Sequence, residues 1–201
     1  MQHLKTSTPA ISFLVPDDAS ELDATRRIFE EYAQSLTVDL CFQDFHNELR
    51  NLPGEYAAPG GTLLLAKVDG AVAGCCALRP LDAADYANAC EIKRLYVRPA
   101  FRGLGLGRDL AERILDTARQ AGYRSVLLDT LDEMETARAL YQDLGFEEVP
   151  PYYHNPIAGA QKVLEIARKQ GLSIKVAAVF GDDVKEILEN KGNDFEVLEN
   201  K

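Results

Sequence analysis

The sequence is poor in the features that mark several classes of protein. Its four cysteines are Cys41, Cys75, Cys76 and Cys90, and none of their spacings resembles a zinc site. Adjacent Cys75 and Cys76 should lie on opposite faces of a strand, so we expect buried free thiols in a reducing compartment. No residue constellation predicts a metal site, and no Ser/His/Asp or Cys/His set predicts a covalent enzyme intermediate.

Long apolar runs and positive charge are also scarce. No apolar run is long enough to span a bilayer, and the N-terminus lacks the apolar segment of a signal peptide. The 22 basic and 32 acidic residues give a formal net charge of −10, which argues against nucleic acid or a membrane as a partner. An amine substrate is compatible with this charge. With 201 residues and 46% hydrophobic content, we expect a cytoplasmic protein with a sizeable core.

The most strongly patterned stretch runs from Glu91 to Gly107. Ile92, Leu95, Tyr96 and Val97 predict a strand, which Pro99 ends because proline has no N–H to donate. Three glycines follow at every second position, and apolar residues then recur at helical spacing: Leu110, Ala111, Ile114, Leu115 and Ala118. A strand, a glycine-rich turn and a helix N-terminus leave several amides aimed at one point, so we predict an anion site suited to phosphate.

Three known kinds of glycine-rich, phosphate-binding turn share parts of this pattern. A P-loop needs Lys-Ser or Lys-Thr after its last glycine, and Arg108-Asp109 stands there instead. A dinucleotide-binding turn needs a sixth-place glycine where this chain has Arg108, although Asp129 supplies the acid expected about 20 residues on. The third is Arg/Gln-x-x-Gly-x-Gly/Ala, matched by Arg102, Gly105 and Gly107. A turn built only for tight packing remains an alternative.

The third pattern resembles the acetyl-CoA motif of the GCN5-related N-acetyltransferases (GNAT). Leu140-Tyr141-Gln142-Asp143-Leu144-Gly145-Phe146 is a second match, because Leu-Tyr-x-x-x-Gly-Phe commonly follows in that family. The resemblance covers about residues 11–158. It departs from the family at Met134, where an asparagine is common, which puts a helix-side cofactor contact in doubt.

The resemblance implies an α/β fold with a mixed, mostly antiparallel sheet flanked by helices. The expected order is strand, two helices, three strands, helix, strand, helix, strand. Local signals agree: Asp18 and Glu21 stand in capping-box positions, Asp69-Gly70 predicts a hairpin, and Gly122 and Gly145 predict helix ends.

The family also implies roles for individual residues. The turn of Arg102, Gly103, Leu104, Gly105, Leu106, Gly107 and Arg108 should hold the pyrophosphate of acetyl-CoA, the acyl donor. Backbone amides of Leu95, Tyr96 and Val97 could bind the thioester carbonyl if the strand is bulged there and leaves amides unpaired. Tyr141 is the candidate acid for the leaving thiolate, and a core tyrosine is the alternative. Glu91 is the candidate base, directly or through a water, and a solvated strand-end acid is the alternative.

Other charged residues receive plainer interpretations. We expect Lys93, Arg94 and Arg98 to be surface charges, and His46 to be a surface histidine rather than a substrate contact. His3 and His154 remain unassigned.

Two functions remain open at this stage. One is transfer of an acetyl group to a primary amine of a small molecule or protein, by a possible homodimer without a metal. The other is a non-catalytic acyl-CoA-binding module, since fold does not fix function. A binding module would not need both Glu91 and Tyr141.

The C-terminal segment departs from the family. We divide the chain into an acetyltransferase-like domain, residues 1–158, and an atypical helix–strand segment with a charged tail, residues 159–201. The run Ile174 to Phe180 is expected to join the main sheet as its last strand, after a helix over about residues 156–169. Such a crossover favours parallel pairing with the strand that starts at Phe146. The alternative is a separate appendage.

Overall fold

The computed structural model of the chain describes residues 8–36, 45–81, 86–128, 130 and 134–147, and the backbone of residues 177–179. The strands are β1 (Ile11–Leu14), β2 (Thr62–Val68), β3 (Ala71–Leu81), β4 (Ala89–Val97), β5 (Ser125–Leu128) and β6 (Ala177–Val179). The helices are α1 (Ala19–Gln34), α2 (Phe45–Asn51), α3 (Leu106–Gln120) and α4 (Glu135–Asp143), with 3₁₀ turns η2 (Gly54–Tyr56) and η3 (Pro99–Phe101).

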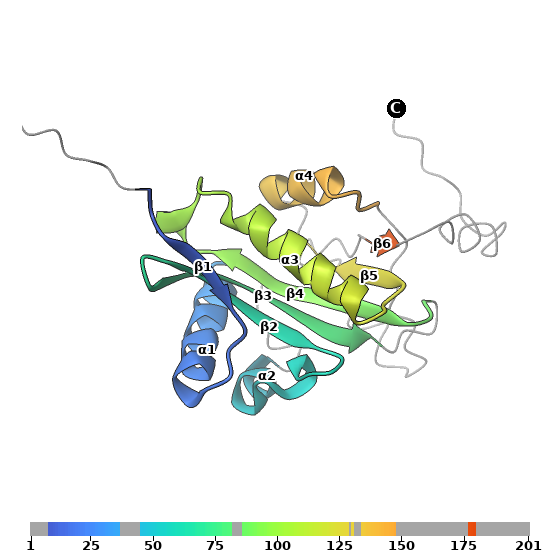
Figure 1. Ribbon diagram of the computed structural model, residues 1–201, viewed down its shortest axis with the longest axis horizontal. Helices are drawn as coiled ribbons and strands as arrows, with labels where there is room; N and C mark the ends of the chain where they lie inside the picture. Colours follow the sequence, from blue (N-terminus) through green and yellow to red (C-terminus); the bar gives the residue numbers. More distant parts are fainter. Residues whose placement is uncertain are drawn as a thin grey trace, which may run out of the picture.

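The strands form one sheet in the order β1-β2-β3-β4-β5-β6 (Figure 1). Every neighbouring pair is antiparallel except β4 and β5, which run parallel with α3 as their crossover. The predicted mixed, mostly antiparallel α/β fold is therefore confirmed, and the order of elements from β1 to α4 is the predicted one. The strand predicted to start at Phe146 lies, beyond Glu147, outside the described part.

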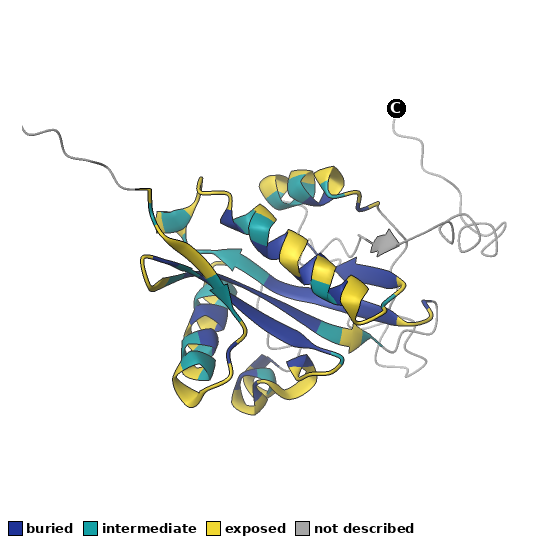
Figure 2. Ribbon diagram, viewed as in Figure 1, coloured by how far each residue is buried: buried dark blue, intermediate teal, exposed yellow. Residues whose placement is uncertain are grey.

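The sheet separates two hydrophobic cores, since successive strand residues alternate between its faces. Leu63, Leu65, Cys75 and Ala77 pack with α1 and α2. Leu64, Ala66, Cys76 and Leu78 pack with α3, Tyr141 and Phe146. Figure 2 shows the central strands buried and the outer surface of α3 exposed. Cys75 and Cys76 thus point to opposite faces, as predicted, and Cys75, Cys76 and Cys90 are buried free thiols.

Helix and turn boundaries follow the local signals in the sequence. The Asp18 side chain accepts a hydrogen bond from the Glu21 amide (2.8 Å) and caps α1. Asp69 and Gly70 both adopt positive φ, +49° and +81°, as a tight hairpin turn between β2 and β3 requires. The sequence predicts a second helix over about Leu40 to Leu52. Helix α2 spans Phe45–Asn51, and residues 40–44 lie outside the described part.

β4 and β5 pair over only part of their lengths. Their register runs from Ala89↔Ser125 to Ile92↔Leu128, whereas β4 continues to Val97. Beyond Ile92, no strand in the described ranges pairs with β4 on this side. The sheet therefore opens there, and the backbone of Lys93–Val97 borders the opening.

The run predicted to be the last strand does join the sheet. Ala177–Val179 pairs antiparallel with β5, from Ser125↔Val179 to Leu127↔Ala177. The direction predicted relative to the strand starting at Phe146, and the helix predicted over 156–169, concern residues outside the described part. The division at residue 158 stays a prediction.

Candidate functional site

The glycine-rich turn places a row of amides at the start of α3. Gly103 and Gly105 have φ of +85° and +81°, a backbone conformation that disfavours residues with a Cβ. Gly105 is the N-cap of α3 and provides no side-chain cap. Within the described residues, the amides of Gly103 to Gly107 donate no hydrogen bond. Five amides without a partner in the described part, at the positive end of a helix dipole, are suited to an anion.

The turn adjoins the opening of the sheet. A Cβ built on Gly107 would lie 3.9 Å from both Val97 Cγ2 and Leu140 Cδ2, so the start of α3 lies between the end of β4 and helix α4. The turn and the edge of β4 that no described strand pairs with therefore border the same space. A long ligand with an anionic end could lie along β4 with its phosphates on the turn.

Strand β4 is bulged just before the residues predicted to bind the thioester. Cys75 pairs with Tyr96 while Ala77 pairs with Lys93, so β4 has one residue more than β3 over this interval. Arg94, within the bulge, has φ of +58°. The strand is therefore bulged where amide binding by Leu95, Tyr96 and Val97 requires it, and that binding stays a prediction.

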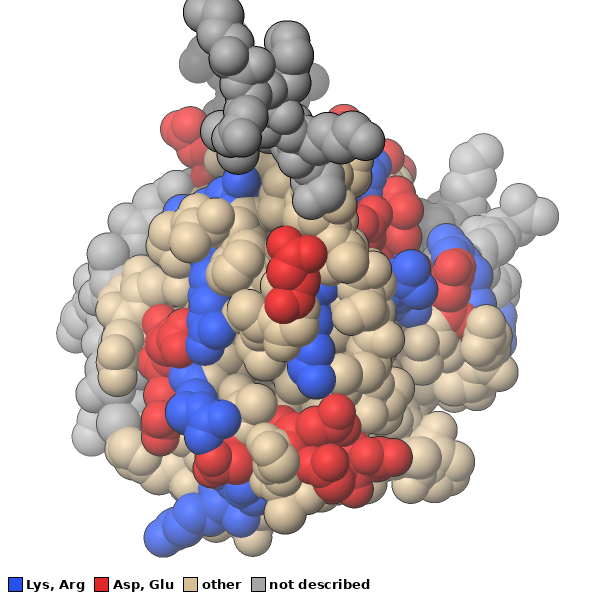
Figure 3. Space-filling view, turned by 60° about the vertical axis from the view of Figure 1, so that its left-hand side comes forward, with Lys and Arg blue, Asp and Glu red and all other residues tan. Residues whose placement is uncertain are grey.

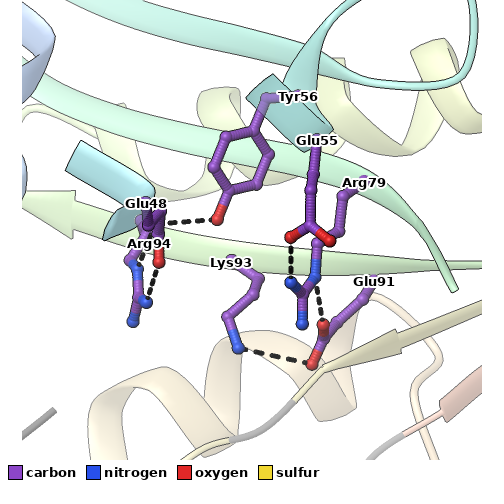
Figure 4. Close-up of polar contacts among 7 residues, drawn as sticks. All are labelled: Glu48, Glu55, Tyr56, Arg79, Glu91, Lys93 and Arg94. Carbon is purple, nitrogen blue, oxygen red and sulfur yellow. Dashed lines mark hydrogen bonds and ion pairs between the residues drawn. The ribbon is translucent and has the colours of Figure 1, made fainter. Parts of the chain in front are cut away.

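Several contacts hold Arg94 in this unusual conformation. Its guanidinium binds the Glu48 carboxylate of α2 through Nε–Oε1 (3.0 Å) and NH2–Oε2 (2.5 Å), and lies 5.1 Å from the centre of the Phe45 ring. The buried Cys75 thiol donates to the Arg94 carbonyl (3.1 Å), and the Tyr56 hydroxyl donates to Glu48 (2.8 Å). Figure 4 shows Glu48, Tyr56 and Arg94 of this group beside Lys93.

Electrostatics matches this arrangement. Burial alone would raise the pKa of Glu48, but the hydrogen bonds and charge of Arg94, aided by Tyr56, outweigh burial and hold it below its usual value. Burial, and then the Glu48 charge, raise the pKa of Tyr56 well above 10. At neutral pH the group is thus an anion bound by a cation and a neutral phenol.

The prediction that Lys93, Arg94 and Arg98 are surface charges is wrong. Lys93 and Arg94 are buried. Lys93 lies on the α2 side by strand alternation with Glu91, and the bulge turns Arg94 to the same side. Arg98 is partly buried and binds both Glu31 carboxylate oxygens of α1 at 2.7 and 2.6 Å. Arg94 and Arg98 pair with acids on helices far away in the sequence. Lys93 pairs with Glu91, two positions away on the same strand.

Glu91 is not the solvated strand-end acid of the alternative interpretation. Its side chain is 0% exposed, and it lies within β4, opposite Arg79 of β3. Arg79 Nε donates to Glu91 Oε2 (2.8 Å), and Lys93 Nζ lies 3.6 Å from Glu91 Oε1 (Figure 4). A base so enclosed can reach an acceptor only through a water or after rearrangement.

Tyr141 is buried on the α3 side of the sheet. Its ring centre lies 5.6 Å from that of Phe146. Burial, and then the charges of Cys76 and Tyr32, raise the pKa of Tyr141 well above 10. The phenol therefore stays protonated at neutral pH, as a proton donor must, and it is also part of the core.

The remaining predicted residues of the turn lie mostly at the surface. Arg102 is exposed and donates from Nε to the Val97 carbonyl (3.2 Å). Arg108 binds Asp143 of α4 (2.9 Å) and approaches Glu112 (3.8 Å). Leu104 is exposed and Leu106 is buried. His46 is exposed, as predicted, whereas His3 and His154 lie outside the described part.

Sequence reasoning missed Arg79, Glu48 and Tyr56 as members of the site. Arg79 stands two and four residues after Ala77 and Cys75, which face α1 and α2, so strand alternation could have placed it on that face. For Glu48 and Tyr56 the sequence carries no comparable signal, since their partners come from other elements.

The comparisons with known proteins decide the family. The family model described as "Acetyltransferase (GNAT) family" matches residues 22–146. The chain belongs to the GNAT acetyltransferase family. An uncharacterised N-acetyltransferase of Schizosaccharomyces pombe is 41% identical over 77% of this chain and 92% of its own length.

Solved structures show the same fold. An acetyltransferase of Streptococcus agalactiae superposes with a TM-score of 0.63 at 19% identity, covering 85% of this chain and 98% of its own. A Salmonella typhimurium protein described with its cofactor acetyl-CoA gives 0.58 at 20% identity, covering 86% and 95%.

Acetyl-CoA is the co-substrate of the GNAT family, and the site of this member suits it. Within the described part of the chain, the free amides of the turn suit a pyrophosphate, and the edge of β4 that no strand pairs with suits an amide-bearing chain. On the face in Figure 3, basic and acidic side chains are interspersed. None of the described helices is long and apolar enough to cross a membrane.

Proposed function

We propose that this GNAT protein moves an acetyl group from acetyl-CoA directly to a primary amine of a small molecule or a protein. The observation that carries the proposal is the row of five free amides at the start of α3, beside the opened edge of β4. Homologues named N-acetyltransferases support catalysis over a binding module. The acceptor would approach from the α2 side, where the charged residues gather.

In the proposed mechanism, the turn from Arg102 to Arg108 holds the pyrophosphate and the edge of β4 aligns the pantetheine arm. An amide among Leu95, Tyr96 and Val97 stabilises the carbonyl oxygen as negative charge develops on it. The amine nitrogen bonds to the carbonyl carbon as the carbon–sulfur bond breaks.

The reaction also requires two proton transfers, one from the acceptor ammonium and one to the thiolate. Glu91 would take the proton of the acceptor ammonium through a water, because its side chain is enclosed. Tyr141 would give its proton to the departing thiolate and regain one from solvent. Both roles remain proposals that mutagenesis can separate.

The test uses the full chain with acetyl-CoA and a panel of free amino acids, polyamines, aromatic amines and peptides. Thiol release with matching acetylated product, detected by mass spectrometry, is expected for at least one amine. Acetyl-CoA binding with no product from any amine class would contradict catalysis and favour the acyl-CoA-binding module.

A further inference from the structure

A polar pocket of about 370 Å³ opens on the α2 side of the sheet. It is lined by residues of α2, η2 and β3, among them Glu48, Glu55, Tyr56 and Arg79. The volume is in the range of sites that bind small molecules. Arg79 pairs with Glu91 in the sheet, and Ile92, the next residue of β4, is the last to pair with β5. The pocket is therefore next to the point where the sheet opens.

Two carboxylates hold Arg79, and they differ in how firmly they are fixed. Glu91 is 0% exposed and binds Nε of Arg79 at 2.8 Å. Glu55, on η2, binds NH1 and is 70% exposed. Separating Glu91 from Arg79 would leave a buried charge without a partner, which is strongly destabilising. The Glu55–Arg79 pair is exposed on the Glu55 side, and such a pair contributes little to stability. Glu55 is thus the exchangeable partner.

The carboxylates that line the pocket already have partners within the protein. Glu48 binds Arg94 and Tyr56, and Glu55 binds Arg79. A polycationic acceptor such as a polyamine would have to break one of these pairs to gain a carboxylate. A ligand carboxylate needs only to replace Glu55 on Arg79, which leaves the charge balance of Arg79 unchanged.

We infer that the pocket binds an acceptor carrying a carboxylate beside its amine, as a free amino acid does, and that Arg79 is its anchor. This inference rests on the proposed function and gives its acceptor a chemical class. The guanidinium presents a planar fork suited to carboxylates. Glu55 binds this fork when no acceptor is present, and the acceptor carboxylate replaces it. A protein N-terminus has no free carboxylate next to its amine and fits this site less well.

The first experiment compares the full chain's binding of free α-amino acids with that of their carboxamides, by calorimetry with CoA present. The acids are expected to bind at least about tenfold more tightly, the effect of losing a hydrogen-bonded charge. Equal binding of acids and carboxamides, or binding of neither, would overturn the inference.

Two substitutions test the roles of Glu55 and Arg79. Glu55→Ala should tighten binding of the acids by up to about fivefold, since a competing exposed ion pair is removed. Arg79→Lys keeps a cation beside Glu91 but loses the fork, so binding of the acids should weaken at least about tenfold. The exposed pair Asp116–Arg119 on α3 gives matched controls, Asp116→Ala and Arg119→Lys, which should change nothing. Unchanged acid binding in both Glu55→Ala and Arg79→Lys would overturn the inference.

Thiol release, measured in parallel, separates this inference from the proposed function. Acetylation of amines and carboxamides as fast as of acids, with Arg79→Lys unaffected, keeps the function and refutes the acceptor class. Arg79-dependent binding of acids without acetyl transfer keeps the pocket assignment and refutes the function.

Discussion

Tyr141 provides the clearest test at the level of a single residue. Tyr141→Phe removes the hydroxyl but keeps the ring against Phe146, so the core should change little. If Tyr141 protonates the thiolate, kcat should fall about 10²–10⁴-fold while acetyl-CoA affinity stays the same. Steady-state kinetics and calorimetry check this, with Tyr123→Phe as a control on a tyrosine that bonds Gly60 instead. An unchanged kcat, with chemistry shown to limit the rate, removes Tyr141 from the mechanism.

Glu91 needs a test that separates catalysis from structure, because it also binds Arg79 and Lys93. Glu91→Gln should slow acetyl transfer most at low pH, where more of the amine carries a proton that must be removed. The measurement is kcat/KM from about pH 6 to 9 for wild type and variant. A loss of equal size at every pH would show that Glu91 only maintains the ion-pair network.

Individual residues differed in how far the sequence could predict them. Glycines at turn and cap positions were predictable, since their backbone conformations follow from local geometry: Gly105, Gly122 and Gly145 all adopt positive φ. Arg94 was not, because its positive φ is held by Glu48 and Cys75, which lie far away in the sequence. The burial of Arg94 follows from that bulge, so it was missed for the same reason.

At the level of elements, the Glu48–Arg94 pair connects α2 to the bulge of β4. The Arg94 side chain is 3% exposed and that of Glu48 is 14% exposed. Removing one partner leaves a poorly solvated charge, so Glu48→Gln or Arg94→Gln should lower the free energy of unfolding by roughly 3–5 kcal/mol.

A double-mutant cycle on these residues checks whether the pair acts as a unit. The double variant should lose clearly less than the sum of the two single losses, because neither charge is then left alone. Urea denaturation measures all four free energies. The exposed pair Arg27–Asp23 on α1 is the control, with an expected coupling below about 1 kcal/mol. Additive losses at Glu48 and Arg94 would contradict the coupling.

Elements with their own start and stop signals were predicted well. β2 ends at Val68, directly before the predicted hairpin turn Asp69-Gly70, and α1 begins after the predicted cap at Asp18. The opening between β4 and β5 was not predicted, because β4 continues as a strand to Val97 and only the register reveals where its pairing with β5 stops. Strand pairing is a tertiary property that a single segment does not encode.

At the level of the whole molecule, the buried thiols predict a loss of stability in alkali. Burial, the largest effect at each, raises the pKa of Cys76 and Cys90 to about 12 and that of Cys75 well above its ordinary value of 9. As pH rises through 9, thiols of the unfolded chain ionise while those of the folded chain do not. The unfolded state is therefore favoured increasingly between about pH 9 and 12.

Urea denaturation in reducing buffer at pH 7.5 and 9.5 measures this effect. The three thiols together should lower the free energy of unfolding by roughly 2–3 kcal/mol over this interval. Cys76→Ala should reduce the difference by about one third, even if its absolute stability is lower. A free energy of unfolding that does not change with pH would contradict the burial of these thiols.

The most direct test of the account is acetyl-CoA affinity when a carboxylate is placed on the turn. Gly105 and Gly122 share φ of +81°, and a Cβ on either meets no atom within 4 Å, so aspartate should strain both backbones equally. Only Gly105 lies at the proposed pyrophosphate site, where a negative charge is repelled. Calorimetry should show at least about a tenfold weaker affinity for Gly105→Asp and wild-type affinity for Gly122→Asp. Equal affinities in the two variants would mean that acetyl-CoA does not bind at this turn.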